Sequence, residues 1–212
     1  MTAIVFARRA LFHAVGLALL CGPASVFQAR AQAAGSTTPI ERLYQGLLTV
    51  MKQGRTTSFS QRAAELTPAV ENAFDLPIVL RASIGPAWVN LTPDEQRRLL
   101  NIFRQYTVAT YVEGFNSYDG QRLVVSPQTR SLSNGGQVVH TEVIPPRGEK
   151  HTIDYVMRRM PDGSWKATDV LADGTISRVA VQRSDFGALL ARGGAAALEA
   201  SLQRKTAALE RS

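Results

Sequence analysis

The chain has 212 residues, of which 45% are hydrophobic and 19% are charged, and its formal net charge is +7 at neutral pH. These proportions are typical of a globular protein and exclude a disordered or low-complexity chain. The basic residues are scattered along the sequence rather than gathered on one segment, which disfavours a nucleic-acid-binding function. The single cysteine, Cys21, excludes an intrachain disulfide, so the fold must depend on its hydrophobic core.

The first 33 residues have the features of a signal peptide. Arg8 and Arg9 precede an apolar run over residues 10–20, which is too short to span a bilayer. Two overlapping A-x-A patterns follow within Ala29–Ala33, so we expect cleavage between about residues 31 and 34. The paired arginines leave both the general and the twin-arginine export route open. Residues 34–212 would then form one domain, with a formal charge of +4 because three arginines leave with the signal.

Capping signals define the predicted helices of the first half of this domain. Thr38 and Glu41 form a capping box with proline at the first helical position, which predicts a helix ending near Gly54. Residues 59–74 are expected to be helical in two pieces, the second starting at Thr67 and Pro68. Asp75 is expected to cap a short helix that ends at Gly85.

The longest predicted helix opens with a second capping box, Thr92 to Glu95, and continues to about Asn116. Its first half is amphipathic, whereas its second half is apolar on nearly all sides because Val108, Tyr111, Val112 and Phe115 lie outside the first apolar stripe. A helix of that kind either packs in the core or borders an apolar ligand cavity. The pattern itself leaves both interpretations open.

Beyond Gly120 the apolar period changes from helical to alternating. Four strands are predicted, over residues 121–126, 137–144, 151–160 and 165–171, and two helices over residues 186–192 and 195–209. The strands form an antiparallel meander with one apolar face, which helices must cover. The fold class is therefore α+β.

Candidate catalytic groups are few. The predicted domain contains no cysteine and only two histidines, which disfavours histidine-based triads and thiol nucleophiles. His140 and Glu142 share a strand face and could hold a metal together with His151, but exposed strand residues explain the same pattern. Asp154 and Asp169 could serve as acids in a pocket, although Asp169 is better explained as the anchor of a turn or an ion pair. We expect no cofactor, no metal and no catalytic residues.

Two segments carry a family resemblance. FDLPIVLRASIGPAWVNLTPDEQ (residues 74–96) and DGSWKATDVLADGTIS (residues 162–177), in this order behind an export signal, resemble the MlaC family of periplasmic phospholipid-binding proteins, also called toluene-tolerance or Ttg-type proteins. The turn DGTIS (residues 173–177), followed by Phe186 and by Gly193 and Gly194, most resembles the hopanoid-associated HpnM branch. This turn replaces a glutamate-containing turn of the phospholipid-binding branch. The resemblance implies a curved four-stranded sheet of cystatin-like or NTF2-like form, with helices on its concave face enclosing an apolar cavity.

The same resemblance implies a function. Family members carry phospholipid through the periplasm, so we expect a monomeric carrier of phospholipid or hopanoid. Its partners would be an inner-membrane lipid transporter, of the MCE-type ABC or the RND kind, and an outer-membrane lipoprotein complex. The alternatives are an NTF2-like enzyme that acts on an apolar small molecule and an adaptor that docks transporter components without carrying lipid.

The predicted cavity wall consists of apolar residues on the inward faces of the predicted helices and strands. These residues are Leu76, Val79, Leu80, Ile84, Trp88, Phe103, Tyr106, Tyr111, Phe115, Val143, Ile153, Tyr155, Met157, Val170 and Ile176.

Overall fold

The computed structural model describes residues 24–211, with side chains from residue 35 onward. The apolar run of the predicted signal peptide lies outside the described residues, as do the side chains of the predicted cleavage stretch. None of the described helices is both long enough and apolar enough to cross a membrane.

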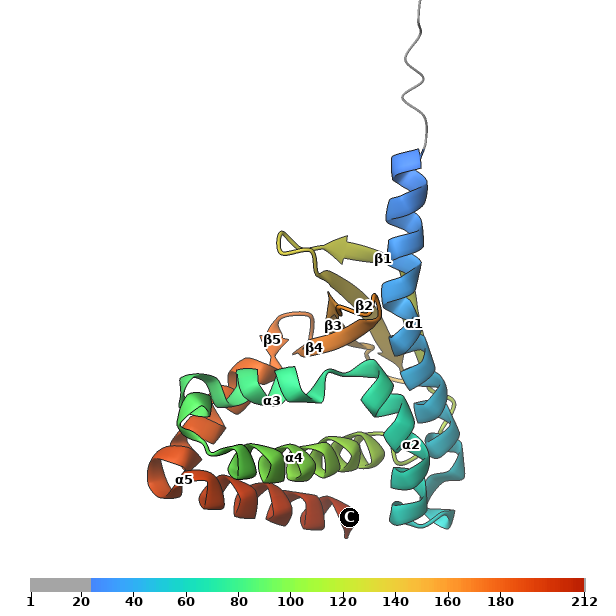
Figure 1. The fold of residues 1–212 in the computed structure, drawn as a ribbon. Helices are drawn as coiled ribbons and strands as arrows, with labels where there is room; N and C mark the ends of the chain where they lie inside the picture. The colour runs from blue at the N-terminus through green and yellow to red at the C-terminus, as the bar shows by residue number, and fades with distance from the viewer. Residues whose placement is uncertain (1–23, 212) are drawn as a thin grey trace, which may run out of the picture.

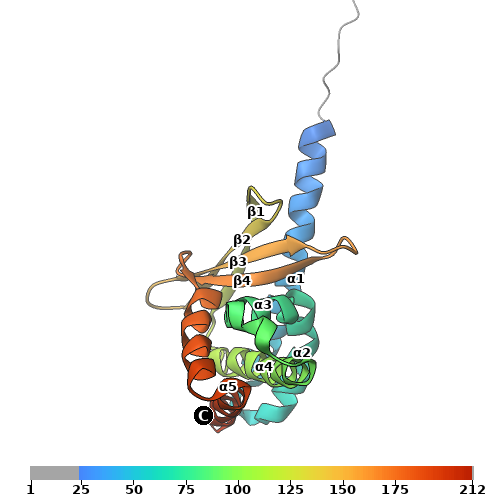
Figure 2. The same cartoon turned by 60° about the vertical axis from the view of Figure 1, so that its left-hand side comes forward.

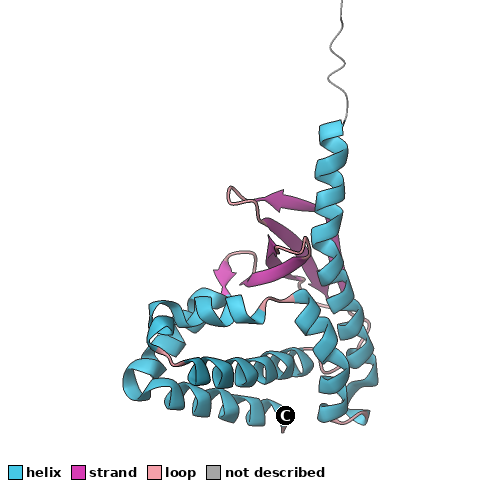
Figure 3. Cartoon of the chain, viewed as in Figure 1, coloured by secondary structure: helices cyan, strands magenta, loops and turns pink. Residues whose placement is uncertain are grey.

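The described chain contains five α-helices, two short 3-10 helices and five strands (Figures 1 and 3). In chain order these are α1 (Ala24–Gln53), η1 (Gly54–Thr56), α2 (Phe59–Ala73), α3 (Leu76–Ile84), η2 (Gly85–Asn90), α4 (Pro93–Gly114), β1 (Arg122–Ser131), β2 (Gln137–Ile144), β3 (His151–Arg159), β4 (Trp165–Ala172), β5 (Ile176–Ser177) and α5 (Arg178–Glu210). The predicted α+β class is confirmed.

The strands form one antiparallel meander in the order β1-β2-β3-β4-β5. Helices α2 to α5 gather on one side of this sheet, and α1 runs past it to pack beside α2 (Figures 1 and 2). The core between the layers is built around Tyr155 and Met157 of β3, which are fully buried against Leu43 and Leu47 of α1 and Phe103 of α4. The apolar stripe predicted for the first helix is therefore its core face.

Two predicted caps are confirmed. The Asp75 side chain accepts a hydrogen bond from the Ile78 amide at 3.0 Å, so it begins α3. At the start of α4, the Thr92 hydroxyl and the Glu95 carboxylate each accept a hydrogen bond from the other residue's backbone amide. Each cap satisfies backbone donors that a helix end would otherwise leave unpaired.

Two proline positions were interpreted wrongly. Helix α1 begins at Ala24 rather than at Thr38, with Pro39 inside it, and α2 is one helix with Pro68 inside it. A proline removes one backbone hydrogen bond, and here the burial of the neighbouring helical faces, including Ile40 and Val70, offsets that loss.

The sheet and the last helix also extend further than predicted. Strand β1 continues past Pro127 to Ser131, with a register shift between Val125 and Thr129, and a proline is tolerated there because β1 is an edge strand. The strand count of four is wrong, since β5 pairs with the end of β4. Helix α5 begins at Arg178 and is broken by non-helical backbone at Gly193 and Gly194, which lie between the two helices predicted over residues 186–192 and 195–209.

Candidate functional site

An open apolar pocket of about 330 Å³ lies between the helices and the sheet. Its wall comes from the α2–α3 junction, the middle of α4, strands β3 and β4, and the first turns of α5. The lining residues are Phe74, Leu76, Val79, Phe103, Tyr106, Thr107, Thr110, Tyr111, Gly114, Phe115, Ile153, Asp169, Val170, Ala172, Arg178, Val179 and Gln182. A volume of this size lies at the lower end of the range for small-molecule sites.

Helix α4 supplies the largest part of this wall. Thr107 and Thr110 are polar residues, but their hydroxyls donate to the carbonyls of Phe103 and Tyr106, both at 2.8 Å. Because each hydroxyl is satisfied one turn back along the helix, neither needs a partner in the pocket. The two alternatives that the sequence left open for α4 apply to different faces of the helix, since Val108 is buried in the core while the face of Thr107 and Thr110 lines the apolar pocket.

Aromatic contacts support the wall. The ring of Tyr111 stacks on that of Phe115, with centroids 6.2 Å apart, and lies 5.6 Å from the ring of Phe74. The Phe103 ring meets that of Phe186 edge to face at 6.3 Å. Such pairs add stability beyond the burial of their area, so the pocket wall is held in place by the protein itself.

Three tyrosines are grouped at the pocket: Tyr111 lines it, and Tyr44 and Tyr155 do not. The Tyr44 hydroxyl shares a 2.5 Å hydrogen bond with that of Thr141, whereas the Tyr155 hydroxyl is fully buried without a hydrogen-bond partner in the described part of the chain. Burial raises the pKa of Tyr155, and the neighbouring Tyr111 and Tyr44 raise it further. Burial likewise raises the pKa values of Tyr44 and Tyr111. All three phenols therefore stay neutral at physiological pH, which keeps negative charge away from the apolar wall.

Polar residues occupy one edge of the pocket, where β4 meets the start of α5. The Asp169 carboxylate is already engaged in hydrogen bonds rather than free in the pocket. Its Oδ1 accepts from the amides of Val170 at 2.7 Å and Val179 at 3.1 Å. Its Oδ2 accepts from the Ser177 hydroxyl at 2.5 Å. Asp169 thus joins β4 to the first turn of α5, which agrees with its interpretation as an anchor.

Eight of the predicted wall residues line this pocket, namely Leu76, Val79, Phe103, Tyr106, Tyr111, Phe115, Ile153 and Val170. Seven others do not, namely Leu80, Ile84, Trp88, Val143, Tyr155, Met157 and Ile176. Leu80, Ile84, Tyr155 and Met157 fill the core, since each has an exposed fraction of at most 2%. Ile176 is 52% exposed on the short edge strand β5. For the four core residues, the inward period was sufficient to predict burial but not contact with an open space.

The sequence interpretation missed Phe74, Thr107, Thr110, Gly114, Asp169, Ala172, Arg178, Val179 and Gln182. Sequence features could have identified Phe74, because it directly precedes the helix cap Asp75 within the first family-like segment. Thr107 and Thr110 repeat at helical spacing with Phe103 and Tyr106, but their polar character concealed them.

The suggested metal cluster is not present. In the part of the chain with described side chains, no group of three or more metal-binding side chains comes together. His140 Nδ1 lies 2.8 Å from Asp154 Oδ1, and its Nε2 lies 3.6 Å from Glu142 Oε1. Glu142 also pairs with Lys150 at 2.5 Å. Neither histidine nor Asp154 lines the apolar pocket.

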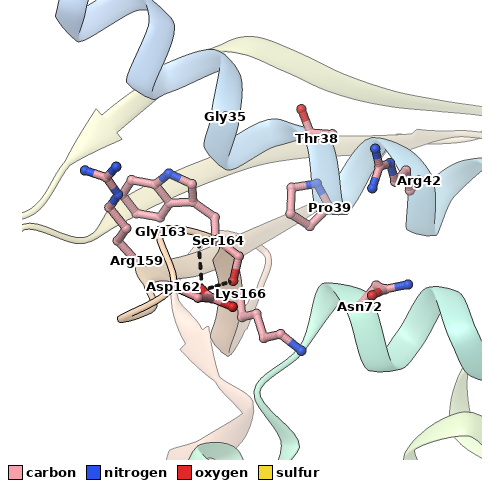
Figure 4. Close-up of a pocket in the computed structure, with 11 residues that line it drawn as sticks. Gly35, Thr38, Pro39, Arg42, Asn72, Arg159, Asp162, Gly163, Ser164 and Lys166 are labelled. Carbon is pink, nitrogen blue, oxygen red and sulfur yellow. Dashed lines mark hydrogen bonds between the residues drawn. The ribbon is translucent and has the colours of Figure 1, made fainter.

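A larger groove of about 970 Å³ lies between α1 and the β3–β4 hairpin (Figure 4). Its lining is mainly polar and includes Arg42, Arg159 and Lys166. The Asp162 carboxylate in its wall accepts from the Ser164 amide and hydroxyl at 2.9 and 2.7 Å, and Lys166 donates to the Glu71 carbonyl at 2.8 Å. This lining does not suit a hydrocarbon chain, so the apolar pocket is the better candidate for a lipid.

Residues 41–204, which make up most of the chain, match the MlaC protein family. The chain belongs to the MlaC family. Among solved structures, it is similar to the phospholipid-binding protein from Ralstonia solanacearum, which was determined in complex with a phospholipid. The TM-score is 0.70 at 21% sequence identity, and the match covers 83% of this chain and 99% of the other. This likeness shows that the two proteins share a fold. A search of curated proteins finds no match to the chain.

Proposed function

We propose that this MlaC-family protein is a periplasmic lipid carrier that holds an acyl chain of a phospholipid in the apolar pocket. The observation that carries the proposal is an open space lined largely by apolar side chains, inside a domain of this family. The fold shared with a phospholipid-binding protein supports it. The pocket-lining residues named above are the proposed lipid contacts.

The volume of the pocket sets an upper limit on the free energy of binding an acyl chain. At ~30 Å³ for each water-sized group, 330 Å³ has room for about eleven methylenes. Burying them gains at most ~9 kcal/mol at ~0.8 kcal/mol each, before the cost of association is subtracted. Loss of the lipid to water is then slow, so transfer requires an acceptor that offers a comparably apolar environment.

The proposed context follows from the predicted signal peptide and the family. The exported and processed chain, residues 34–212, would carry lipid as a monomer between an inner-membrane transporter, of MCE-type ABC or RND kind, and an outer-membrane lipoprotein complex. A hopanoid is the second ligand class, because the turn at residues 173–177 resembles the HpnM branch. We propose no catalytic role, since the one carboxylate in the pocket wall is engaged in holding α5.

Native mass spectrometry of the purified mature protein, followed by lipid extraction, tests the proposal. The expected result is one lipid bound per protein molecule. A protein that neither copurifies with lipid nor takes it up from vesicles would favour the adaptor alternative. Turnover of an apolar substrate that is lost in Asp169→Asn or Asp154→Asn would instead favour the enzyme.

A further inference from the structure

One cationic side chain, that of Arg178, lies among the residues that line the apolar pocket. It is the first residue of α5 and directly follows the helix cap Ser177. The side chain is exposed, so its charge remains hydrated while its position borders the apolar wall. This juxtaposition of a cation with an apolar pocket matches the two parts of a phospholipid, which has an anionic headgroup and hydrocarbon chains.

The guanidinium of Arg178 forms no hydrogen bond and no ion pair within the described part of the chain, although it lies close enough to Tyr111 to interact with it electrostatically. Arg98 and Arg104 form ion pairs with glutamates, and Arg183 donates to the Ala82 carbonyl at 2.9 Å. Arg178 forms neither kind of contact, so its donors are available to a ligand. Several other exposed arginines are also unpaired, and the position of Arg178 at the pocket distinguishes it from them.

The nearby acid, Asp169, forms no ion pair with Arg178 in the described part of the chain. Both oxygens of Asp169 are occupied by the Val170 and Val179 amides and the Ser177 hydroxyl. These bonds attach the backbone on either side of Arg178 to strand β4. They therefore fix the base of the arginine at the edge of the pocket while leaving its guanidinium free.

A second donor lies one turn further along α5. Gln182 also lines the pocket, and residues four apart share one face of a helix. Its side-chain oxygen accepts a hydrogen bond from the Ser83 hydroxyl at 2.8 Å, which leaves its amide nitrogen as a donor. The edge of the pocket thus presents a guanidinium and an amide nitrogen together.

We propose that Arg178, assisted by Gln182, binds the phosphodiester of the lipid headgroup and makes the protein selective for phospholipids over uncharged lipids with the same acyl chains. A phosphodiester carries one negative charge and only hydrogen-bond acceptors, and the planar guanidinium matches it with two parallel bonds. The inference rests on the proposed lipid-binding function and adds the chemical class of headgroup. It disfavours an uncharged hopanoid as the main ligand.

The test compares a phosphatidylglycerol with a diacylglycerol that has identical acyl chains. Each is offered in neutral carrier vesicles to the delipidated mature protein, and bound lipid is measured by native mass spectrometry. We expect the wild type to prefer phosphatidylglycerol by about tenfold to hundredfold, the range for charge-assisted hydrogen bonds. Arg178→Gln should bring this ratio close to one, and Arg178→Lys should lie between the two.

Arg192→Gln is the matched control, because Arg192 is exposed on the same helix and does not line the pocket. It should keep the wild-type ratio. An unchanged ratio in folded Arg178→Gln would overturn the inference while leaving the carrier function intact. If the wild type binds neither lipid, the proposed function itself fails. Inorganic phosphate forms a third arm: Arg178-dependent phosphate binding without any preference between the lipids would assign the site to a free anion.

Discussion

Replacing Thr110 with phenylalanine tests directly whether the pocket on α4 holds hydrocarbon. Thr110 lines the pocket and is half-buried, so a larger side chain there occupies space that an acyl chain would use. The substitution adds four non-hydrogen atoms, which excludes about four methylenes. At ~0.8 kcal/mol for each methylene, the loss of binding free energy is ~3 kcal/mol. This corresponds to roughly 200-fold weaker binding.

The assay is displacement of a fluorescent fatty acid from delipidated protein by phospholipids of graded chain length. Besides the lower affinity, Thr110→Phe should shift the optimum toward chains about four methylenes shorter. Thr49→Phe is the matched control, since the Thr49 hydroxyl donates to the carbonyl of Gln45, at 3.1 Å, in the same way. Thr49 is exposed on α1 and does not line the pocket, so this variant should bind like the wild type. A folded Thr110→Phe protein with unchanged affinity and chain-length optimum would refute the assignment of the pocket.

Three further predictions concern stability, measured by chemical or thermal unfolding. Tyr155→Phe should be neutral or stabilising by about 1 kcal/mol, because it removes a buried hydroxyl that lacks a hydrogen-bond partner. Tyr44→Phe should instead destabilise by about 1 kcal/mol, because it loses a hydrogen bond. Equal losses of stability in both variants would contradict this prediction. Gly194→Ala should lower the free energy of unfolding by about 1–3 kcal/mol, because the φ of 62° and ψ of −158° at Gly194 suit only glycine. Gly187→Ala is the matched control: Gly187 lies in regular helix with open space around it, so this variant should raise the free energy of unfolding by up to ~1 kcal/mol. Hydrogen bonds from Thr92, the cap of α4, lower the pKa of Glu95 from its ordinary value of 4.5, so the stability that the Glu95 charge provides is present above pH 4.5 and is lost as the pH falls through the lowered pKa. Glu95→Gln should therefore make the loss of stability at acidic pH less steep. An unchanged acid dependence would show that the cap does not depend on this charge.

Local signals were sufficient for most of the fold. The sequence directly predicts features that depend only on neighbours within a few positions. These are the helix caps at Asp75 and Thr92, the alternating strands, and the helix break at Gly193 and Gly194. The start of α5 at Arg178 was missed, although Ser177 supplies a local cap by accepting a hydrogen bond from the Ala180 amide at 2.9 Å. The bond from the Val179 amide to Asp169 could not be predicted from local signals, because Asp169 lies on a different element and becomes a partner only after the chain folds.

The site was harder to predict than the fold. Periodicity separates inward from outward positions, but it does not say which inward positions meet an open space. On β3, Ile153 and Met157 share the inward face, yet Ile153 lines the pocket and Met157 is fully buried in the core. A charge at Met157 would therefore disrupt folding rather than report on lipid retention. Thr110 shows the converse error, because its polar identity conceals a hydroxyl that the helix backbone already satisfies.

The arrangement separates two determinants of ligand choice. The apolar space is kept open from behind by aromatic pairs such as Phe74 with Tyr111 and Phe103 with Phe186, whose stiff rings resist collapse into the pocket. A pocket that is already formed loses little affinity to ordering when its ligand enters. Chain length is then set by the volume beside α4, whereas headgroup preference is set at the pocket edge by Arg178. Because these positions lie on different helices, changing Thr110 should alter the chain-length preference but not the headgroup preference, and changing Arg178 should alter the headgroup preference but not the chain-length optimum.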